Sequence, residues 1–271
     1  MSEIIFKAED VRFSYLGKYP ALRGVNISVE KGQRVAIIGA NGSGKSTLLH
    51  LFDALIFPDS GSVKAFGVEL GEGAFNDEGF NHEFRSKVGL VFQNPDVQLF
   101  CPTVKEEVMF GPLNLGFDRK EIDKVFDPIM KIFGIEDLSD RMPHQLSIGE
   151  KRKVSMASVL ISGPEVLLLD EPTAGLDPRT SRGLVDLLNK YHGDGKTIIT
   201  ATHDMHIIEE IADIVYVFNH DKTIIRSARP AELLADTTFL HENNLIHVHS
   251  HIHDGKSHVH PHEHPSHEHT H

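Results

Sequence analysis

The residues from Gly39 to Thr47, GANGSGKST, have the spacing of a phosphate-binding loop. The apolar run RVAIIG precedes them and a helix is predicted from Lys45, so the motif has the strand-to-helix context that it requires. Glycines let backbone N–H groups point at phosphate oxygens, and the helix N-terminus adds partial positive charge. We expect Lys45 to reach the β- and γ-phosphates of a nucleotide and Ser46 to bind Mg²⁺. The loop residues expected to bind nucleotide are Gly39, Ala40, Asn41, Gly42, Ser43, Gly44, Lys45, Ser46 and Thr47.

A second stretch, EVLLLDEP (165–172), places two carboxylates directly after an apolar run. Such a run predicts a buried strand, and ligands bind at the carboxyl ends of parallel strands. Asp170 is placed to hold Mg²⁺, directly or through water. Glu171 is placed to polarise an attacking water. Together with the phosphate loop, the pair predicts metal-assisted hydrolysis of a nucleotide.

The sequence closes on HVHSHIHDGKSHVHPHEHPSHEHTH, and residues 241–271 contain twelve of its nineteen histidines. The stretch lacks six consecutive histidines, which argues against an engineered purification tag. Its low aliphatic content predicts a disordered, solvated tail in the absence of metal. In an extended segment the pattern H-x-H places both imidazoles on one side, and neutral imidazole binds nickel, copper, zinc or cobalt. Binding should weaken below about pH 6, where histidine gains its proton. The candidate ligands for nickel or cobalt are His247, His249, His251, His253, His258, His260, His262, His264, His267, His269 and His271.

The motifs together resemble the ATPase subunit of ATP-binding-cassette (ABC) transporters over roughly residues 3–235. The stretch LSIGEKRK (146–153) is similar to the family signature LSGGQ, with Ile148 in place of glycine and Glu150 in place of glutamine. The resemblance implies that the signature binds the γ-phosphate of a nucleotide held by the opposite subunit. The signature residues are Leu146, Ser147, Ile148, Gly149 and Glu150.

The same resemblance assigns roles to single residues elsewhere. It makes Gln93 the hinge glutamine that reaches the metal and the attacking water. It makes His203, in ATHD, the residue that contacts the γ-phosphate, and Tyr15 the aromatic that stacks on adenine. Asp177, in AGLD, belongs to the loop that crosses the dimer interface. The implied catalytic residues are Glu171, His203 and Gln93, and the implied Mg²⁺ ligands are Ser46, Gln93 and Asp170.

The resemblance also implies partners. One phosphate loop and one signature in one polypeptide imply a head-to-tail dimer of identical chains or close paralogues, with two shared ATP sites. The stretch FQNPDVQLF (92–100) resembles the energy-coupling-factor importers, in which the ATPase docks on a transmembrane coupling protein and works with a substrate-binding membrane subunit. This stretch and the tail favour an importer of nickel or cobalt over one of vitamins.

Three alternatives remain open. The protein could energise transport of a vitamin or another small molecule, act as a non-transport ABC ATPase on DNA or the ribosome, or store or sense metal with an inert cassette. The net charge of −12 argues against nucleic acid as a partner. No stretch approaches the roughly 18 to 20 apolar residues that cross a bilayer. With no signal peptide at the N-terminus either, we expect the protein at the cytoplasmic face of the cell membrane, held there by membrane subunits.

Alternation of strands and helices after residue 162 predicts an α/β fold with a parallel sheet. With the resemblance, we expect a P-loop NTPase (RecA-like) core, an N-terminal antiparallel β subdomain and an inserted α-helical subdomain at about 95–162. The domain would span residues 1–240 and the tail 241–271. The glycine-rich stretch 67–80 is predicted to be a surface loop, and the predicted N-terminal strands cover 4–15 and 25–30.

Overall fold

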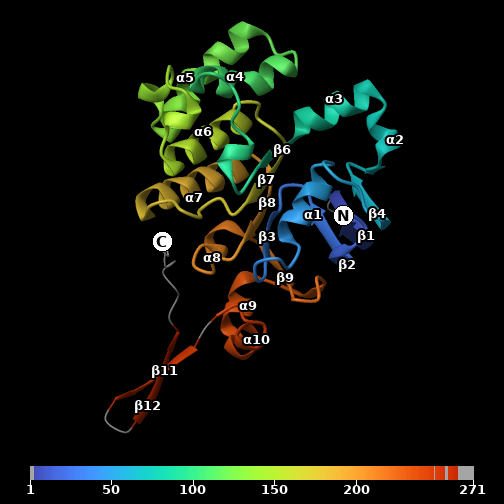
Figure 1. Cartoon of the computed structure of the whole chain (residues 1–271), viewed down its shortest axis with the longest axis vertical. Helices are drawn as coiled ribbons and strands as arrows, with labels where there is room; N and C mark the ends of the chain where they lie inside the picture. Colours follow the sequence, from blue (N-terminus) through green and yellow to red (C-terminus); the bar gives the residue numbers. More distant parts are fainter. Residues whose placement is uncertain (1–2, 247, 254–255, 262–271) are drawn as a thin grey trace.

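Two sheets and a helical arm form the main body of the molecule (Figure 1). The computed structural model describes residues 3–246, 248–253 and 256–261. Within the larger sheet every pairing is parallel except that of the edge strand β10 (Ile224–Ala228) with β9 (Ile214–Phe218). The order of that six-stranded sheet is β10, β9, β3 (Arg34–Ile38), β8 (Thr197–Thr202), β7 (Val166–Asp170) and β6 (Val88–Val91).

The central strands β3, β7 and β8 are buried along almost their whole length because helices cover both faces of the sheet. Their register is parallel, with Ile38 beside Thr202 and Asp170 beside Ala201. The segments that follow these three strands therefore leave the sheet at the same edge. This register brings the phosphate loop, Glu171 and the residues after Thr202 together.

The N-terminal strands form a separate four-stranded antiparallel sheet, which packs on the helix α1 (Lys45–Phe52) that follows the phosphate loop. Phe6 and Phe52 mark this contact, with ring centroids 4.8 Å apart. The strand predicted at 4–15 is confirmed, whereas the next strand begins six residues before the predicted start at Val25. The sheet has the order β2 (Tyr19–Glu30), β1 (Ile4–Tyr15), β4 (Ser60–Ala65) and β5 (Val68–Glu69).

The glycine-rich stretch 67–80 contains helical segments, so the prediction of a plain surface loop was wrong. Helix α2 spans Glu72–Phe75 and α3 spans Glu78–Lys87. The Asp77 side chain caps α3 by accepting the Phe80 N–H. The rings of Phe75, Phe80 and Phe84 pack against one another. These apolar contacts hold the two helices in place, although the surrounding glycines hide the pattern in the sequence.

The helical arm follows β6 and has its own apolar core (Figure 1). Thr103 and Asp118 cap its first two long helices through their side chains. Helix α7 (Pro178–Gly193) covers the nearby face of the parallel sheet. The elements of the arm are η1 (Pro95–Val97), α4 (Val104–Asn114), α5 (Arg119–Phe133), η2 (Glu136–Leu138), η3 (Pro143–Gln145) and α6 (Ile148–Leu160).

The C-terminal helices bury a third apolar cluster against the sheet, which includes Ile38, Val217, Leu233 and Leu240. These helices are α8 (Ile208–Ile211), α9 (Pro230–Ala235) and α10 (Thr237–Glu242). Helix α10 runs through residue 240, where the sequence placed the end of the domain, and Leu245 and Ile246 still pack on this cluster.

Part of the histidine-rich tail forms a pair of antiparallel strands, β11 (Val248–His253) and β12 (Lys256–Pro261), in contrast to the predicted disorder. The reason is visible in the sequence, because Val and Ile alternate with other residues on both sides of Asp-Gly, a common two-residue hairpin turn. His247 and the histidines from His262 onward lie outside the described residues.

Candidate functional site

A cavity of about 330 Å³ opens at the carboxyl edge of the parallel sheet. It brings together predicted residues from the end of β1, the phosphate loop, the segment after β6 and the end of β7. The sequence reasoning missed four of its residues. The lining consists of Tyr15, Tyr19, Pro20, Ala21, Asn41, Gly42, Gly44, Lys45, Ser46, Thr47, Gln93, Glu171 and Lys222.

The phosphate loop requires glycine at two positions where a side chain would collide with neighbouring atoms. A Cβ at Gly39, where φ is +154°, would lie 2.8 Å from Ser43 Oγ, and a Cβ at Gly44, where φ is +111°, would lie 2.5 Å from Ala21 O. Gly44 begins α1 without a side-chain cap. The first N–H groups of this helix are therefore left for an anionic ligand.

Lys45 is buried inside this loop. Its Nζ donates to Gly39 O at 2.8 Å and to Ala40 O at 3.2 Å, and it lies 3.9 Å from Glu171 Oε1. Burial lowers the pKa of Lys45, and the nearby Glu171 and Asp170 partly restore it. The ammonium group is thus held at the loop by neutral carbonyls, which phosphate oxygens can replace.

Asp170 and Ser46 fit a magnesium ion. Asp170 Oδ1 is buried and has no hydrogen-bond partner among the described residues. Burial raises the pKa of Asp170, while a hydrogen bond from Ser46 lowers it. Carboxylate, hydroxyl and amide oxygens are the ligands that Mg²⁺ accepts, and Gln93 supplies an amide oxygen in the same cavity.

Glu171 has a strained backbone and a fixed side chain. Its φ is +47°, and its N–H donates to Ala201 O at 2.8 Å. Its Oε2 accepts the His203 Nδ1–H at 2.8 Å and the His203 backbone N–H at 3.3 Å. The hydrogen bond to Glu171 raises the pKa of His203. The structure thereby joins two of the three predicted catalytic side chains, and the carboxylate between Lys45 and His203 can take a proton from water.

Tyr15 lies at the mouth of the cavity, where its hydroxyl lies 3.2 Å from Thr47 Oγ1. The overlooked Tyr19 offers a second exposed aromatic ring, which the spacing after Tyr15 could have suggested. Lys222 carries no sequence signal, because it reaches the cavity from the turn after β9 and donates to Pro20 O. These residues add aromatic and cationic groups to the lining of the cavity.

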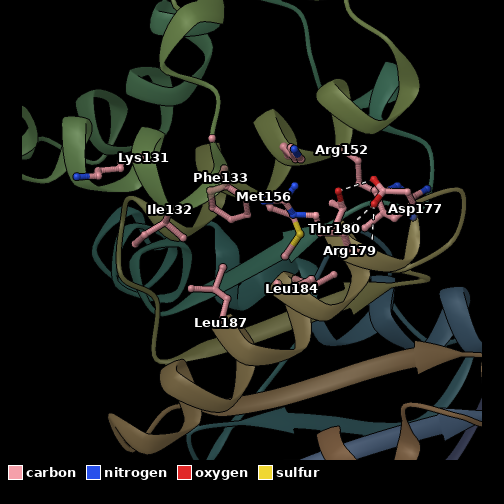
Figure 2. Close-up of a pocket in the computed structure, with 14 residues that line it drawn as sticks. Lys131, Ile132, Phe133, Arg152, Met156, Asp177, Arg179, Thr180, Leu184 and Leu187 are labelled. Carbon is pink, nitrogen blue, oxygen red and sulfur yellow. Dashed lines mark hydrogen bonds between the residues drawn. The ribbon is translucent and has the colours of Figure 1, made fainter.

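The signature residues are absent from the lining of this cavity. Ser147 caps α6, and Glu150 accepts both its N–H at 2.8 Å and its hydroxyl at 2.7 Å. Ile148 is 61% exposed. Asp177 likewise lies elsewhere, beside a second cleft of about 570 Å³ between α5, α6 and α7 (Figure 2). In the described part of the protein the predicted residues thus form two separate groups. One lies around the cavity on the phosphate loop, and the other consists of the signature and Asp177.

Among the side chains that the structure describes, no group of three or more His, Cys, Asp or Glu residues is arranged to hold a metal ion. In the tail only the backbone of β11 and β12 is described. In the same described residues no helix is long and apolar enough to span a membrane. Metal binding by the tail histidines therefore stays a prediction.

The family model described as "ABC transporter" matches residues 22–174. The nickel import ATP-binding protein NikO of Rhodobacter capsulatus is 46% identical over 89% of this chain and 95% of its own length. The energy-coupling factor transporter ATP-binding protein EcfA of Methanocaldococcus jannaschii is 41% identical over 89% and 85%. The solved structure of cbiO1 from Clostridium perfringens, part of the ABC transporter complex cbiONQ, has 37% identity, a TM-score of 0.74 and coverage of 90% and 95%. The chain belongs to the ABC transporter family, as an ATP-binding subunit.

Proposed function

We propose that this protein hydrolyses MgATP as one half of a head-to-tail dimer and thereby powers import of nickel or cobalt through membrane subunits. The observation that carries the proposal is the pairing of Glu171 with His203 and Lys45 in a cavity built on the phosphate loop. The metal substrate is supported by the 46% identity to NikO, whose name states nickel import.

The residues of the cavity divide the hydrolytic work. Lys45 exchanges the carbonyls of Gly39 and Ala40 for phosphate oxygens. Ser46, Asp170 and Gln93 would hold Mg²⁺, which when bound would neutralise negative charge on the phosphates. Glu171 accepts the proton of the attacking water, and His203 fixes the direction of its carboxylate. Tyr15, at the mouth, offers its ring to the adenine.

A dimer is proposed because the signature residues do not line the described cavity of their own subunit. Ser147, Gly149 and the N-terminus of α6 are absent from the described lining of the subunit's own cavity. They form an exposed helix N-terminus, which suits an anion. A second subunit that presents this end to the phosphates would complete each site, and Asp177 would contact that subunit from the start of α7.

The docking surface for the membrane partner is proposed at an exposed apolar patch beside Gln93. Phe100 and Phe110 are 66% and 43% exposed, and their rings meet edge to face with centroids 4.8 Å apart. Val97 and Leu113 extend the patch. Glu107 is buried and holds the backbone of the patch in place by accepting the Phe100 N–H at 2.8 Å. Exposed apolar groups of this kind mark interaction sites.

The tail is proposed to bind the transported metal. In the paired strands His249 lies opposite His260 and His251 opposite His258 in Cα register. Borderline-soft imidazole groups suit nickel, cobalt, copper and zinc. A tail that binds metal would raise the local concentration of ions near the importer.

The test is uptake of radioactive nickel and cobalt by cells that carry this protein with its membrane partners. Glu171→Gln should abolish both uptake and ATP hydrolysis. Glu165→Gln is the matched control, because it removes the same charge just before the opposite end of β7. Uptake of a vitamin, and of neither metal, would overturn the metal assignment. ATP hydrolysis that survives Glu171→Gln would overturn the catalytic assignment.

A further inference from the structure

The signature helix α6 is bonded directly to the hydrolytic pair of its own subunit. Arg152, in the second turn of this helix, is only 8% exposed. Its guanidinium donates to the backbone oxygen of Glu171 through one terminal nitrogen and to that of Gln93, at 2.7 Å, through the other. One side chain thus spans two segments that approach the cavity from different parts of the fold, and Figure 2 shows it beside the cleft next to Asp177.

Further contacts fasten the segment after Gln93 to the same helix. Lys151 Nζ lies 2.7 Å from Asp96 Oδ1. The Gln98 side chain donates to Ser155 O at 2.8 Å and accepts the Phe92 N–H at 3.2 Å. These contacts tie residues 92–98 to α6.

The N-terminal end of α6 contains the signature, which is proposed to bind the nucleotide of the opposite subunit. Ser147, which caps the helix, lies five residues before Arg152, a rise of about 7.5 Å along the helix axis. The rest of the helix is anchored in the core of the arm through Val154, Met156 and Leu160. A displacement of the signature end is therefore transmitted to Arg152 through a rigid element.

Glu171 is the group that such a displacement would affect most. Its left-handed backbone conformation persists only where surrounding contacts hold it. Its carbonyl accepts bonds from Arg152 and from the Ala174 N–H at 3.2 Å, and its N–H donates to Ala201. Of these three partners, Arg152 alone comes from the helical arm. A shift at Arg152 changes where the Glu171 carboxylate points.

We propose that Arg152 is a positioning residue that couples the two ATP sites of the dimer. When the signature of one subunit binds the nucleotide on its partner, α6 sets Arg152, and Arg152 sets Glu171 and Gln93 of that same subunit. Each site then hydrolyses only when the other is filled. This inference rests on the proposed dimer and adds the path by which its sites communicate.

Mixed dimers separate this role from mere support of the signature. Two differently tagged copies of the full chain are combined, and one copy carries Glu171→Gln, so that only the other copy hydrolyses. Arg152→Met in the active copy should lower the single-turnover rate roughly a hundredfold, with the KM for MgATP nearly unchanged. Arg152→Met in the inactive copy, whose signature completes the active site, should lower it far less.

Lys153→Met is the matched control, because Lys153 is the next cation on α6 and has no bond to Gln93 or Glu171 among the described residues. Arg152→Lys keeps the charge but cannot reach two carbonyls at once, so an intermediate rate is expected from a protein that folds. Adding Lys45→Met to the inactive copy should slow the active site strongly when Arg152 is present and little further when it is replaced.

Equal losses from the two placements of Arg152→Met, additive effects with Lys45→Met, or a full rate with Arg152→Lys would each overturn the coupling. A different result tests the dimer itself. If unmodified copies stay monomeric with MgATP, the proposed function fails before Arg152 is examined.

Discussion

The carboxylate of Glu150 lies at the place where the signature is expected to receive a partner's phosphate. Its Oε2 is 2.7 Å from Ser147 Oγ and 2.8 Å from Ser147 N. The bonds from Ser147 lower the pKa of Glu150, so the group is charged at neutral pH. Glutamine at this position would form the same capping box without the charge. We predict that Glu150→Gln strengthens ATP-driven dimerisation.

The magnitude follows from the geometry. A phosphate oxygen bonded to Ser147 Oγ at about 2.7 Å would lie about 5 Å from the Glu150 carboxylate. Two unit charges at about 5 Å repel by about 0.8 kcal/mol in water and by about 3 kcal/mol at an effective dielectric constant near 20. Glu150 is only partly buried and remains in contact with solvent, so we use the lower value for each site. Two sites per dimer give about 1.6 kcal/mol, or roughly a fifteenfold lower dimer dissociation constant.

The assay is sedimentation of Glu171→Gln copies with MgATP, with and without Glu150→Gln. The gain should shrink as salt is raised, since the repulsion is exposed and screened. Glu121→Gln, on the exposed face of α5, is the control for loss of one negative charge. An unchanged or weaker dimer with Glu150→Gln, or an equal gain from Glu121→Gln, would refute the reasoning.

Two further predictions concern groups outside the cavity. Burial raises the pKa of Asp53 from 3.8 to about 7, although Arg85 opposes this. Folding therefore favours the protonated form of Asp53. The resulting stabilisation is complete below about pH 4 and is lost as the pH rises through 7. Relative to Asp53→Asn, the free energy of unfolding of the parent should fall by up to about 4 kcal/mol between pH 4 and 8, and chemical denaturation that shows parallel pH profiles would contradict this. Ile148→Gly should raise steady-state ATP hydrolysis in the presence of the membrane partners, because the exposed β-branched side chain restricts the signature backbone; an unchanged rate would contradict that account.

The parts of the fold that the sequence predicted are those with a strong local pattern. The strand 4–15 alternates, and the parallel strands are unbroken apolar runs that end in turns. The helices α2 and α3 escaped prediction because glycine and asparagine surround their three anchoring phenylalanines. The tail strands were not predicted because the histidine-rich composition of this segment is typical of disordered chains.

The candidate site divides in the same way. Asp170, Glu171 and His203 could be placed together because parallel strands that end in polar residues bring them to one edge. Arg152 could not, since its partners lie 19 and 59 residues away and depend on how the arm packs on the sheet. Lys222 likewise requires the turn after β9 to lie beside Pro20.

The charges of the cavity explain why the second subunit matters energetically. Two buried carboxylates, Asp170 and Glu171, are balanced by two buried cations, Lys45 and Arg152. Because these four groups already compensate one another, the phosphates of MgATP are left mainly with the backbone N–H groups of the phosphate loop in the same subunit. In the proposed dimer, the helix N-terminus at Ser147 of the second subunit would add further donors. The carboxylate of Glu150 lies at this helix N-terminus and opposes the attraction of the phosphates. Removal of its charge should therefore strengthen the dimer more than removal of any acid outside the proposed dimer interface.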